Sequence, residues 1–185
     1  MSLEQDRQRL AGILTKYSVR RGGEYKLASG RVSDVYCDAR VTTCRAEAMP
    51  LVGRLFLAAM AERGWRPHAV GGLTMGADPI VIAVARESIE TATPMNAFLV
   101  RKEAKGHGKG KQIEGLAEDE TALDVVIVED TSTTGGSAVK AMEAAREAGH
   151  RVLGVITLVD REEGAREAVE AAGCPYVAVF RIGEL

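Results

Sequence analysis

Short apolar runs without polar alternation recur along the chain from residue 69 onward, and segments with a helical pattern separate them. Strands that are apolar on both faces have to be covered by helices on both sides. The pattern therefore predicts an α/β fold with a central parallel sheet, whose functional loops lie at the carboxyl ends of the strands. The expected strands are Ala69–Gly72, Asn96–Val100, Asp124–Val128, Val152–Val159 and Tyr176–Phe180, and the expected helices are Asp78–Arg86, Ser137–Gly149 and Glu162–Gly173.

The residues before this sheet predict a smaller unit. Leu3–Tyr17 has the pattern of an amphipathic helix with Ser2 as its N-cap, and Gly22–Asp38 that of a hairpin whose second strand is Val32–Cys37. A further helix is expected over Thr43–Gly64. Because no linker or repeat divides the chain, we expect residues 1–185 to form a single domain, with the first helix and the hairpin as a hood within about residues 1–40.

Composition excludes several classes of protein. A formal net charge of −2 argues against a nucleic-acid binder, which needs basic side chains to neutralise phosphates. No apolar stretch approaches the ~20 residues that span a bilayer, and the N-terminus lacks the apolar run of a secretory signal. The three cysteines lack Cys-x-x-Cys spacing, so they indicate neither a disulfide framework nor a zinc site. We therefore expect a soluble cytoplasmic protein with no nucleic-acid and no membrane partner.

The most informative segment follows the central strand, where two adjacent acids, Glu129 and Asp130, precede four hydroxyl residues, two glycines and a helix start. Successive backbone N–H groups in such a turn form a concave nest, and the helix N-terminus adds partial positive charge, so a phosphate monoester fits there. The acids would repel a phosphate, but they can accept hydrogen bonds from sugar hydroxyls, with or without a bridging Mg²⁺. The loop residues are Thr131, Ser132, Thr133, Thr134, Gly135, Gly136 and Ser137.

The simpler alternative is a turn between strand and helix, capped by Thr134 or Ser137. Paired acids, hydroxyls and a glycine pair exceed what capping requires, and no P-loop pattern is present. The segment resembles the 5-phosphoribosyl-1-diphosphate (PRPP) binding motif of the type I phosphoribosyltransferases. That resemblance implies their fold, a central parallel sheet flanked by helices with a small N-terminal hood. It also implies that Glu129 and Asp130 contact the ribose hydroxyls and that Thr131–Ser137 holds the 5-phosphate.

A basic, glycine-rich segment follows the strand that ends at Val100. Residues 101–111 carry five positive charges and one negative charge, with glycine at every second position from 106 to 110. Such a loop disfavours helix and strand, and it could close over a polyanion and neutralise a departing diphosphate. His107 could donate a proton or a hydrogen bond to that group. The alternative is a solvated basic loop without a function.

The pattern Arg-Lys-x-x-Lys-x-His-Gly in this segment resembles the catalytic loop of the orotate phosphoribosyltransferases. The resemblance implies a homodimer in which the loop reaches into the partner's site, with Lys105 and His107 acting across the dimer. Two further segments also resemble this family. They are Ser29–Tyr36, which would frame orotate, and Asp160-Arg161-Glu162. The implied PRPP contacts from the loop are Arg101, Lys102, Lys105 and His107, and the implied orotate contacts are Thr133 and Arg161.

The chain departs from the family pattern at two places. Some members carry a lysine just before the Ser-Gly-Arg segment, where this chain has Ala28. Some carry Tyr-Lys after the glycine turn of the first sheet strand, where this chain has Gly72-Leu73-Thr74-Met75-Gly76. Those lysine contacts do not carry over, and the roles of Ala28, Met75 and Gly76 stay open.

The resemblance implies transfer of the phosphoribosyl group from PRPP to orotate. Mg²⁺ would arrive on PRPP without metal ligands of the protein's own, and Lys105, His107, Glu129 and Asp130 would form the catalytic set. Positioning and electrostatics would supply most of the rate. Two alternatives remain at this point: a phosphoribosyltransferase for another base, which would not need Arg161, and a PRPP-sensing regulator on the same fold. Cys37 is interpreted as a small buried side chain, and His150 as a surface histidine.

Overall fold

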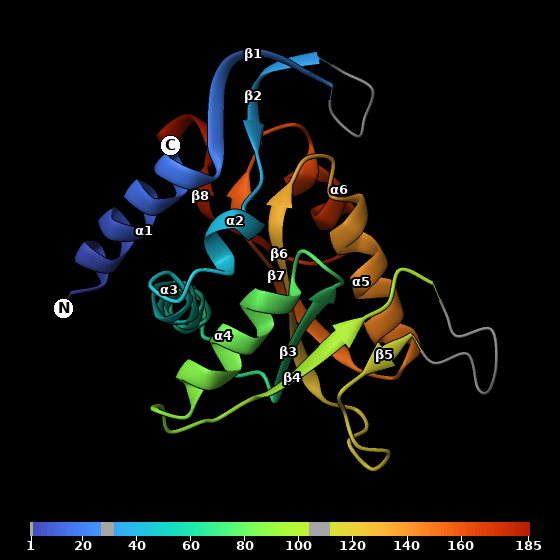
Figure 1. The fold of residues 1–185 in the computed structure, drawn as a ribbon. Helices are drawn as coiled ribbons and strands as arrows, with labels where there is room; N and C mark the ends of the chain where they lie inside the picture. Colours follow the sequence, from blue (N-terminus) through green and yellow to red (C-terminus); the bar gives the residue numbers. More distant parts are fainter. Residues whose placement is uncertain (1, 27–31, 104–111) are drawn as a thin grey trace.

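The computed structural model describes residues 2–26, 32–103 and 112–185. Within them, the main body is a sheet with the strand order β5-β4-β3-β6-β7-β8, in which every strand but β5 runs parallel to its neighbours (Figure 1). The predicted parallel sheet is therefore confirmed. Its strands are β3 (Ala69–Leu73), β4 (Asn96–Val100), β5 (Ile113–Glu114), β6 (Asp124–Ser132), β7 (Arg151–Asp160) and β8 (Tyr176–Arg181).

Helices cover both faces of this sheet, as the apolar strands require. One core contains residues of α1 (Leu3–Tyr17), α3 (Met49–Glu62) and α4 (Asp78–Ser88). The other contains residues of α5 (Gly136–Glu147) and α6 (Ala165–Ala171). The central strand β6 divides its side chains between the two cores, since Val126 and Val128 belong to the first and Val125 and Ile127 to the second.

A small hood lies over the edge of the sheet at which the arrows of β6 and β7 end (Figure 1). It consists of the antiparallel strands β1 (Val19–Lys26) and β2 (Val32–Cys37), followed by the short helix α2 (Arg40–Thr43). The predicted first helix is confirmed with its cap, because the Ser2 side chain accepts a hydrogen bond from the backbone of Gln5. The chain ends in a 3-10 turn, η1 (Ile182–Glu184).

Several element boundaries differ from the sequence-based expectation, and α6, for example, begins at Ala165 instead of Glu162. The helix expected over Thr43–Gly64 begins at Met49, with a proline in its first turn, and Thr43 belongs to the separate α2. The central strand continues to Ser132 instead of ending at Val128, because its polar end still pairs with β7. The two-residue strand β5, which no apolar run predicted, pairs antiparallel with β4 at the edge of the sheet.

The interpretation of His150 as a surface residue is wrong. Its ring is buried, and Nδ1 accepts a hydrogen bond from the backbone N–H of Leu123 at 3.3 Å. Burial lowers the pKa of His150, which favours the neutral ring that this hydrogen bond needs. In the part of the chain that the structure describes, no helix combines the length and the apolar character needed to cross a membrane.

Candidate functional site

A cavity of about 340 Å³ lies where the hood meets the carboxyl edge of the sheet. The end of β2, the turn after β3, the segment after β4, the end of β6 with its loop, and the residue after β7 all contribute to its lining. Segments that are far apart in the sequence thus meet at one place, as parallel topology predicts. Of the residues singled out from the sequence, those that line the cavity are Lys102, Glu129, Asp130, Thr131, Thr133, Ser137 and Arg161.

The two acids enter the cavity from the end of β6, each with its own partners. Oε2 of Glu129 accepts a hydrogen bond from the Ser132 hydroxyl at 2.6 Å, and Oδ1 of Asp130 accepts one from the backbone N–H of Thr131 at 2.8 Å. Burial raises the pKa of Glu129 to about 7 and also raises that of Asp130. The hydroxyls of Ser132 and Ser137 oppose the shift in Glu129 because they bind the charged form. The site therefore presents two desolvated carboxyl groups that both line the cavity.

The loop between β6 and α5 presents backbone donors without acceptors. The amides of Thr133, Thr134 and Gly135 donate to no other residue within the described ranges. The following helix α5 adds the partial positive charge of its N-terminus. Free amides in front of a helix start are the arrangement that binds phosphate in many proteins.

Gly135 explains why this loop has its shape. It is the N-cap of α5 with φ +79°, and a Cβ at this position would stand 2.9 Å from the carbonyl oxygen of Ala165. Only glycine combines that backbone conformation with so close an approach to the neighbouring segment. The alternative of a turn capped by Thr134 or Ser137 is wrong, because no side chain caps this helix. Thr134 is exposed, and Ser132 is buried against Glu129.

The turn after β3 closes the cavity opposite the loop. Thr74, Met75 and Gly76 line the cavity, and the peptide bond between Thr74 and Met75 is cis. A Cβ at residue 76 would stand 2.4 Å from Oδ1 of Asp130, so this backbone packs directly against a carboxylate of the site. Gly76, whose role the sequence left open, is thus a packing partner of Asp130.

Arg161 is buried at the far end of the cavity, after β7. Its Nε donates to Oε1 of Glu163 at 3.0 Å, and its Nη2 donates to the Ser33 hydroxyl and to the carbonyl of Val35, both at 3.2 Å. These bonds tie the hood strand β2 to the end of β7. Arg161 Nη1 donates to no other described residue, so this nitrogen is available to a ligand in the cavity.

The basic segment after β4 is only partly described. Lys102 lines the cavity, whereas Arg101 lies on the surface, where its guanidinium pairs with Glu114 at 3.5 Å. Predictions for Lys105 and His107 fall outside the described residues, as do those for Ala28 and for Ser29 to Arg31.

Sequence reasoning did not single out Asp38 and Arg40, which line the cavity from the hood. The sequence did contain a weak indication of these two residues, because two opposite charges follow a predicted strand. Cys37, the residue before them, is half-buried, and burial raises the pKa of its thiol to about 11. It is therefore a protonated side chain, in agreement with the sequence-based interpretation.

Within the described ranges, no three residues among His, Cys, Asp and Glu come together as a metal-binding group. Glu129 and Asp130 nevertheless offer adjacent carboxylate oxygens, the ligand type that Mg²⁺ prefers. One or two protein carboxylates combined with substrate phosphates is a common way to hold this ion, and the lining fits that arrangement.

The chain is similar along almost its whole length to proteins of one family. It is 43% identical over 182 residues to an orotate phosphoribosyltransferase of Aquifex aeolicus, an alignment that covers 97% of each chain. The structure of the Mycobacterium tuberculosis orotate phosphoribosyltransferase with Fe(III) dicitrate has a TM-score of 0.83 and 43% identity, over 97% of this chain and 98% of that one. The structure of the same Mycobacterium tuberculosis protein in complex with PRPP has a TM-score of 0.79 and 39% identity, over 97% of this chain and 98% of that one. No family model matches the chain.

Proposed function

The chain belongs to the orotate phosphoribosyltransferase family, and from that premise we propose that the cavity at the carboxyl edge of the sheet is its active site. The enzyme transfers the 5-phosphoribosyl group from PRPP to orotate and so forms orotidine 5′-monophosphate and diphosphate in pyrimidine biosynthesis. The observation that carries the placement is the convergence on one cavity of paired carboxylates, of Thr133 and Ser137 from the loop, and of a buried arginine.

PRPP occupies the side of the cavity formed by β6 and its loop. The free amides of Thr133, Thr134 and Gly135 hold the 5-phosphate, with the hydroxyls of Thr133 and Thr134 as further donors, while the Ser132 hydroxyl is held by Glu129. Glu129 and Asp130 accept hydrogen bonds from the ribose hydroxyls and thereby fix the anomeric carbon. Support for these roles comes from the free acceptor positions of both carboxylates and from the loop geometry around Gly135.

Orotate occupies the side of the cavity near the hood. Its carboxylate pairs with Nη1 of Arg161, while Nε and Nη2 of the same side chain are held by Glu163, Ser33 and Val35. Thr133 reaches the same space from the loop. A base without a carboxylate would leave Nη1 of this buried guanidinium without an acceptor, so the arrangement favours orotate over other bases.

The reaction breaks the bond from the anomeric carbon to the diphosphate and forms a bond to a ring nitrogen of orotate. Positive charge develops on the ribose ring as the diphosphate leaves, as in other glycosyl transfers. The two fixed carboxylates orient the ribose and stabilise that charge. Lys102 neutralises the leaving group at the cavity, and the predicted catalytic roles of Lys105 and His107 stay predictions. Mg²⁺ bound to PRPP would add Lewis-acid stabilisation of the diphosphate next to Glu129 and Asp130.

A homodimer is part of this proposal, with the loop after Lys102 shared between subunits. Large apolar side chains on and beside α4 support it, since Ile82 is 57% exposed, Ile89 63% and Met75 67%. Ile82 and Ile89 are two helical turns apart and so share one face. A cytoplasmic location stays a prediction from the sequence.

The base specificity is tested by following PRPP-dependent loss of orotate, with adenine, guanine, hypoxanthine and uracil in parallel reactions. We expect turnover of orotate alone. Turnover of a different base would leave the PRPP half of the site intact and would contradict the placement of orotate against Arg161. PRPP binding without turnover of any base would contradict the enzymatic role. It would instead support the alternative of a PRPP-sensing regulator on the same fold.

A further inference from the structure

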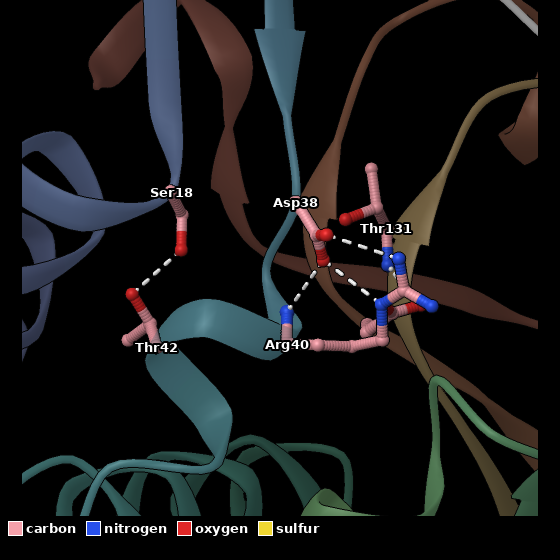
Figure 2. Close-up of polar contacts among 6 residues, drawn as sticks. Ser18, Asp38, Arg40, Thr42 and Thr131 are labelled. Atoms are coloured by element: carbon pink, nitrogen blue, oxygen red, sulfur yellow. Dashed lines mark hydrogen bonds and ion pairs between the residues drawn. The ribbon is translucent and has the colours of Figure 1, made fainter.

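Arg40 lines the cavity from the hood, and the roles proposed above do not use it. It is the first residue of α2, directly after the end of β2. Its Nε donates to Oδ1 of Asp38 at 2.9 Å and its Nη2 to Oδ2 at 3.0 Å, while its backbone N–H donates to Oδ1 at 3.2 Å (Figure 2). Asp38 therefore fixes both the main chain and the guanidinium of Arg40.

The segment that carries Asp38 and Arg40 is fixed to the rest of the hood by hydrogen bonds. The hydroxyls of Ser18 and Thr42 share a buried hydrogen bond of 2.7 Å, which joins α2 to the start of β1 (Figure 2). The backbone N–H of Asp38 donates to the carbonyl of Ser18 at 3.0 Å. A side chain held in this way loses little further entropy when it binds a ligand, which is the usual advantage of a preorganised site.

The guanidinium keeps donors for a ligand. Arginine has five N–H groups in a planar fork, and within the described ranges those of Nη1 donate to no residue. Arg40 and Thr131 at the end of β6, both labelled in Figure 2, line the same cavity. The positive charge of Arg40 opposes the burial that raises the pKa of Asp130, and both residues line the same cavity.

The charges that line the cavity explain why a cation is needed at position 40. Three carboxylates line the cavity, those of Asp38, Glu129 and Asp130. Both substrates are anions, and binding them beside carboxylates requires compensating cations. Among the described lining residues the cations are Arg40, Lys102 and Arg161, and in both arginines the protein holds Nε and Nη2 and leaves Nη1 for a ligand.

We infer that Arg40 is a further substrate-binding residue, whose guanidinium, oriented by Asp38, holds an oxyanion of the bound substrates at the hood side of the cavity. The oxyanion is either the diphosphate of PRPP or the carboxylate of orotate, since charge-assisted hydrogen bonds from the free Nη1 suit both. The inference rests on the proposed placement of the substrates in this cavity.

The chain offers a matched control for an ordinary surface ion pair. Arg151 makes the same two-pronged contact with Asp124, Nε to Oδ1 and Nη2 to Oδ2, at the opposite edge of the sheet and outside the cavity. Exposed pairs of this kind contribute little to stability. A difference between Arg40 and Arg151 variants therefore reports on the cavity and not on the loss of an exposed ion pair.

The test compares steady-state KM values for PRPP and for orotate in wild type, Arg40→Gln, Arg40→Lys and Arg151→Gln. We expect Arg40→Gln to raise KM for one substrate about 10-fold or more, from the loss of a charge-assisted hydrogen bond. Arg40→Lys, which keeps the charge but loses the fork, should fall between Arg40→Gln and wild type. Arg151→Gln should keep both KM values. A rise for PRPP identifies the diphosphate as the ligand, and a rise for orotate identifies the carboxylate.

A second readout separates binding from folding. Melting temperatures of the four proteins should agree within a few degrees, and calorimetric titration with inorganic diphosphate and with orotate should show the same loss as the KM values. Unchanged KM values and unchanged titrations for Arg40→Gln would overturn the inference while the wild-type turnover keeps the function. An equal loss in Arg151→Gln would overturn it as well. Absence of wild-type turnover would instead overturn the proposed active site.

Discussion

Asp130 lies against the backbone of Gly76, so closely that a Cβ at residue 76 would stand 2.4 Å from its Oδ1 and 2.7 Å from its Cγ. The turn after β3 and the end of β6 therefore fix each other at the point where the ribose is expected. Some family members carry a lysine in this turn, and this chain does not. The turn therefore contributes to the site through its backbone. Glycine at position 76 is what lets that backbone approach the carboxylate.

We predict that Gly76→Ala lowers kcat/KM for PRPP about 10-fold or more, because the added methyl group displaces Asp130 from its position. The measurement is steady-state kinetics at varied PRPP. Gly12→Ala in α1 is the matched control, since nothing lies within 4 Å of a Cβ there. That variant should keep kcat/KM and gain a little stability. Full activity in Gly76→Ala would contradict the role of this contact.

The buried carboxyl of Glu129 predicts a pH dependence of stability. Its pKa rises from an ordinary 4.5 to about 7 on folding, so the folded state holds an extra proton between these values. The stabilisation that protonated Glu129 gives the folded state is fully present below the pKa of the unfolded chain, and it is lost as the pH rises through about 7. Glu129→Gln cannot titrate, so its free energy of unfolding should fall less between about pH 5 and pH 8, by on the order of 2 kcal/mol.

Urea unfolding of the free protein at the two pH values measures this difference. Glu143→Gln, which removes an exposed glutamate from α5, is the control and should follow the wild type. If wild type and Glu129→Gln lost the same free energy of unfolding, the carboxyl would not be desolvated in the folded protein.

Arg161→Lys should raise KM for orotate about 10-fold and leave KM for PRPP within a factor of about 3, because an ammonium cannot replace the planar fork. The control is Arg181→Lys, an exposed arginine at the end of β8. Arg161 also holds Ser33 and Val35 of the hood. An equal rise of both KM values would therefore mean that Arg161 acts by holding the hood and not by binding the base.

The double variant Ile82→Asp/Ile89→Asp should be a monomer in sedimentation velocity and should lose most of its activity, since charges on this apolar face oppose association. Leu3→Asp, an exposed apolar position on α1, is the control and should stay associated. A stable, active dimer of the double variant would place the interface elsewhere.

Sharing of the basic loop is tested separately by mixing two inactive variants. In a hybrid of a Lys105→Ala subunit with an Asp130→Asn subunit, one site has both side chains intact only if the loop acts across the dimer. Random mixing should then restore about a quarter of the wild-type rate. No recovery after mixing would contradict a shared loop.

Sequence patterns predicted the sheet because its strands are buried on both faces, and runs such as Val125–Val128 leave little choice of structure. The polar end of β6 was missed, since the ladder from Glu129 to Ser132 depends on pairing with β7 and not on hydrophobicity. The start of α3 had a local signal in Pro50, which fits only the first turn of a helix. β5 had none, because two residues at a sheet edge have no periodicity.

The candidate site was partly predictable for the same reason. The acids and the loop at 129–137 form one continuous motif, and parallel topology places such motifs at one edge of the sheet. The contact between Gly76 and Asp130 joins residues 54 positions apart in the chain, and only the folded structure brings them together. Asp38 and Arg40 were overlooked because a pair of charges after a strand is common, and only the folded hood, anchored through Ser18 and Thr42, places them in the cavity.

The most direct test of the proposed active site is the rate of orotate consumption by Asp130→Asn at varied PRPP. Asparagine keeps the shape of the side chain and an acceptor for the amide of Thr131 but removes the negative charge. We predict a fall in kcat/KM for PRPP of about 100-fold with an unchanged melting temperature. A value within a factor of about 2 of the wild type would contradict the placement of the ribose at this carboxylate.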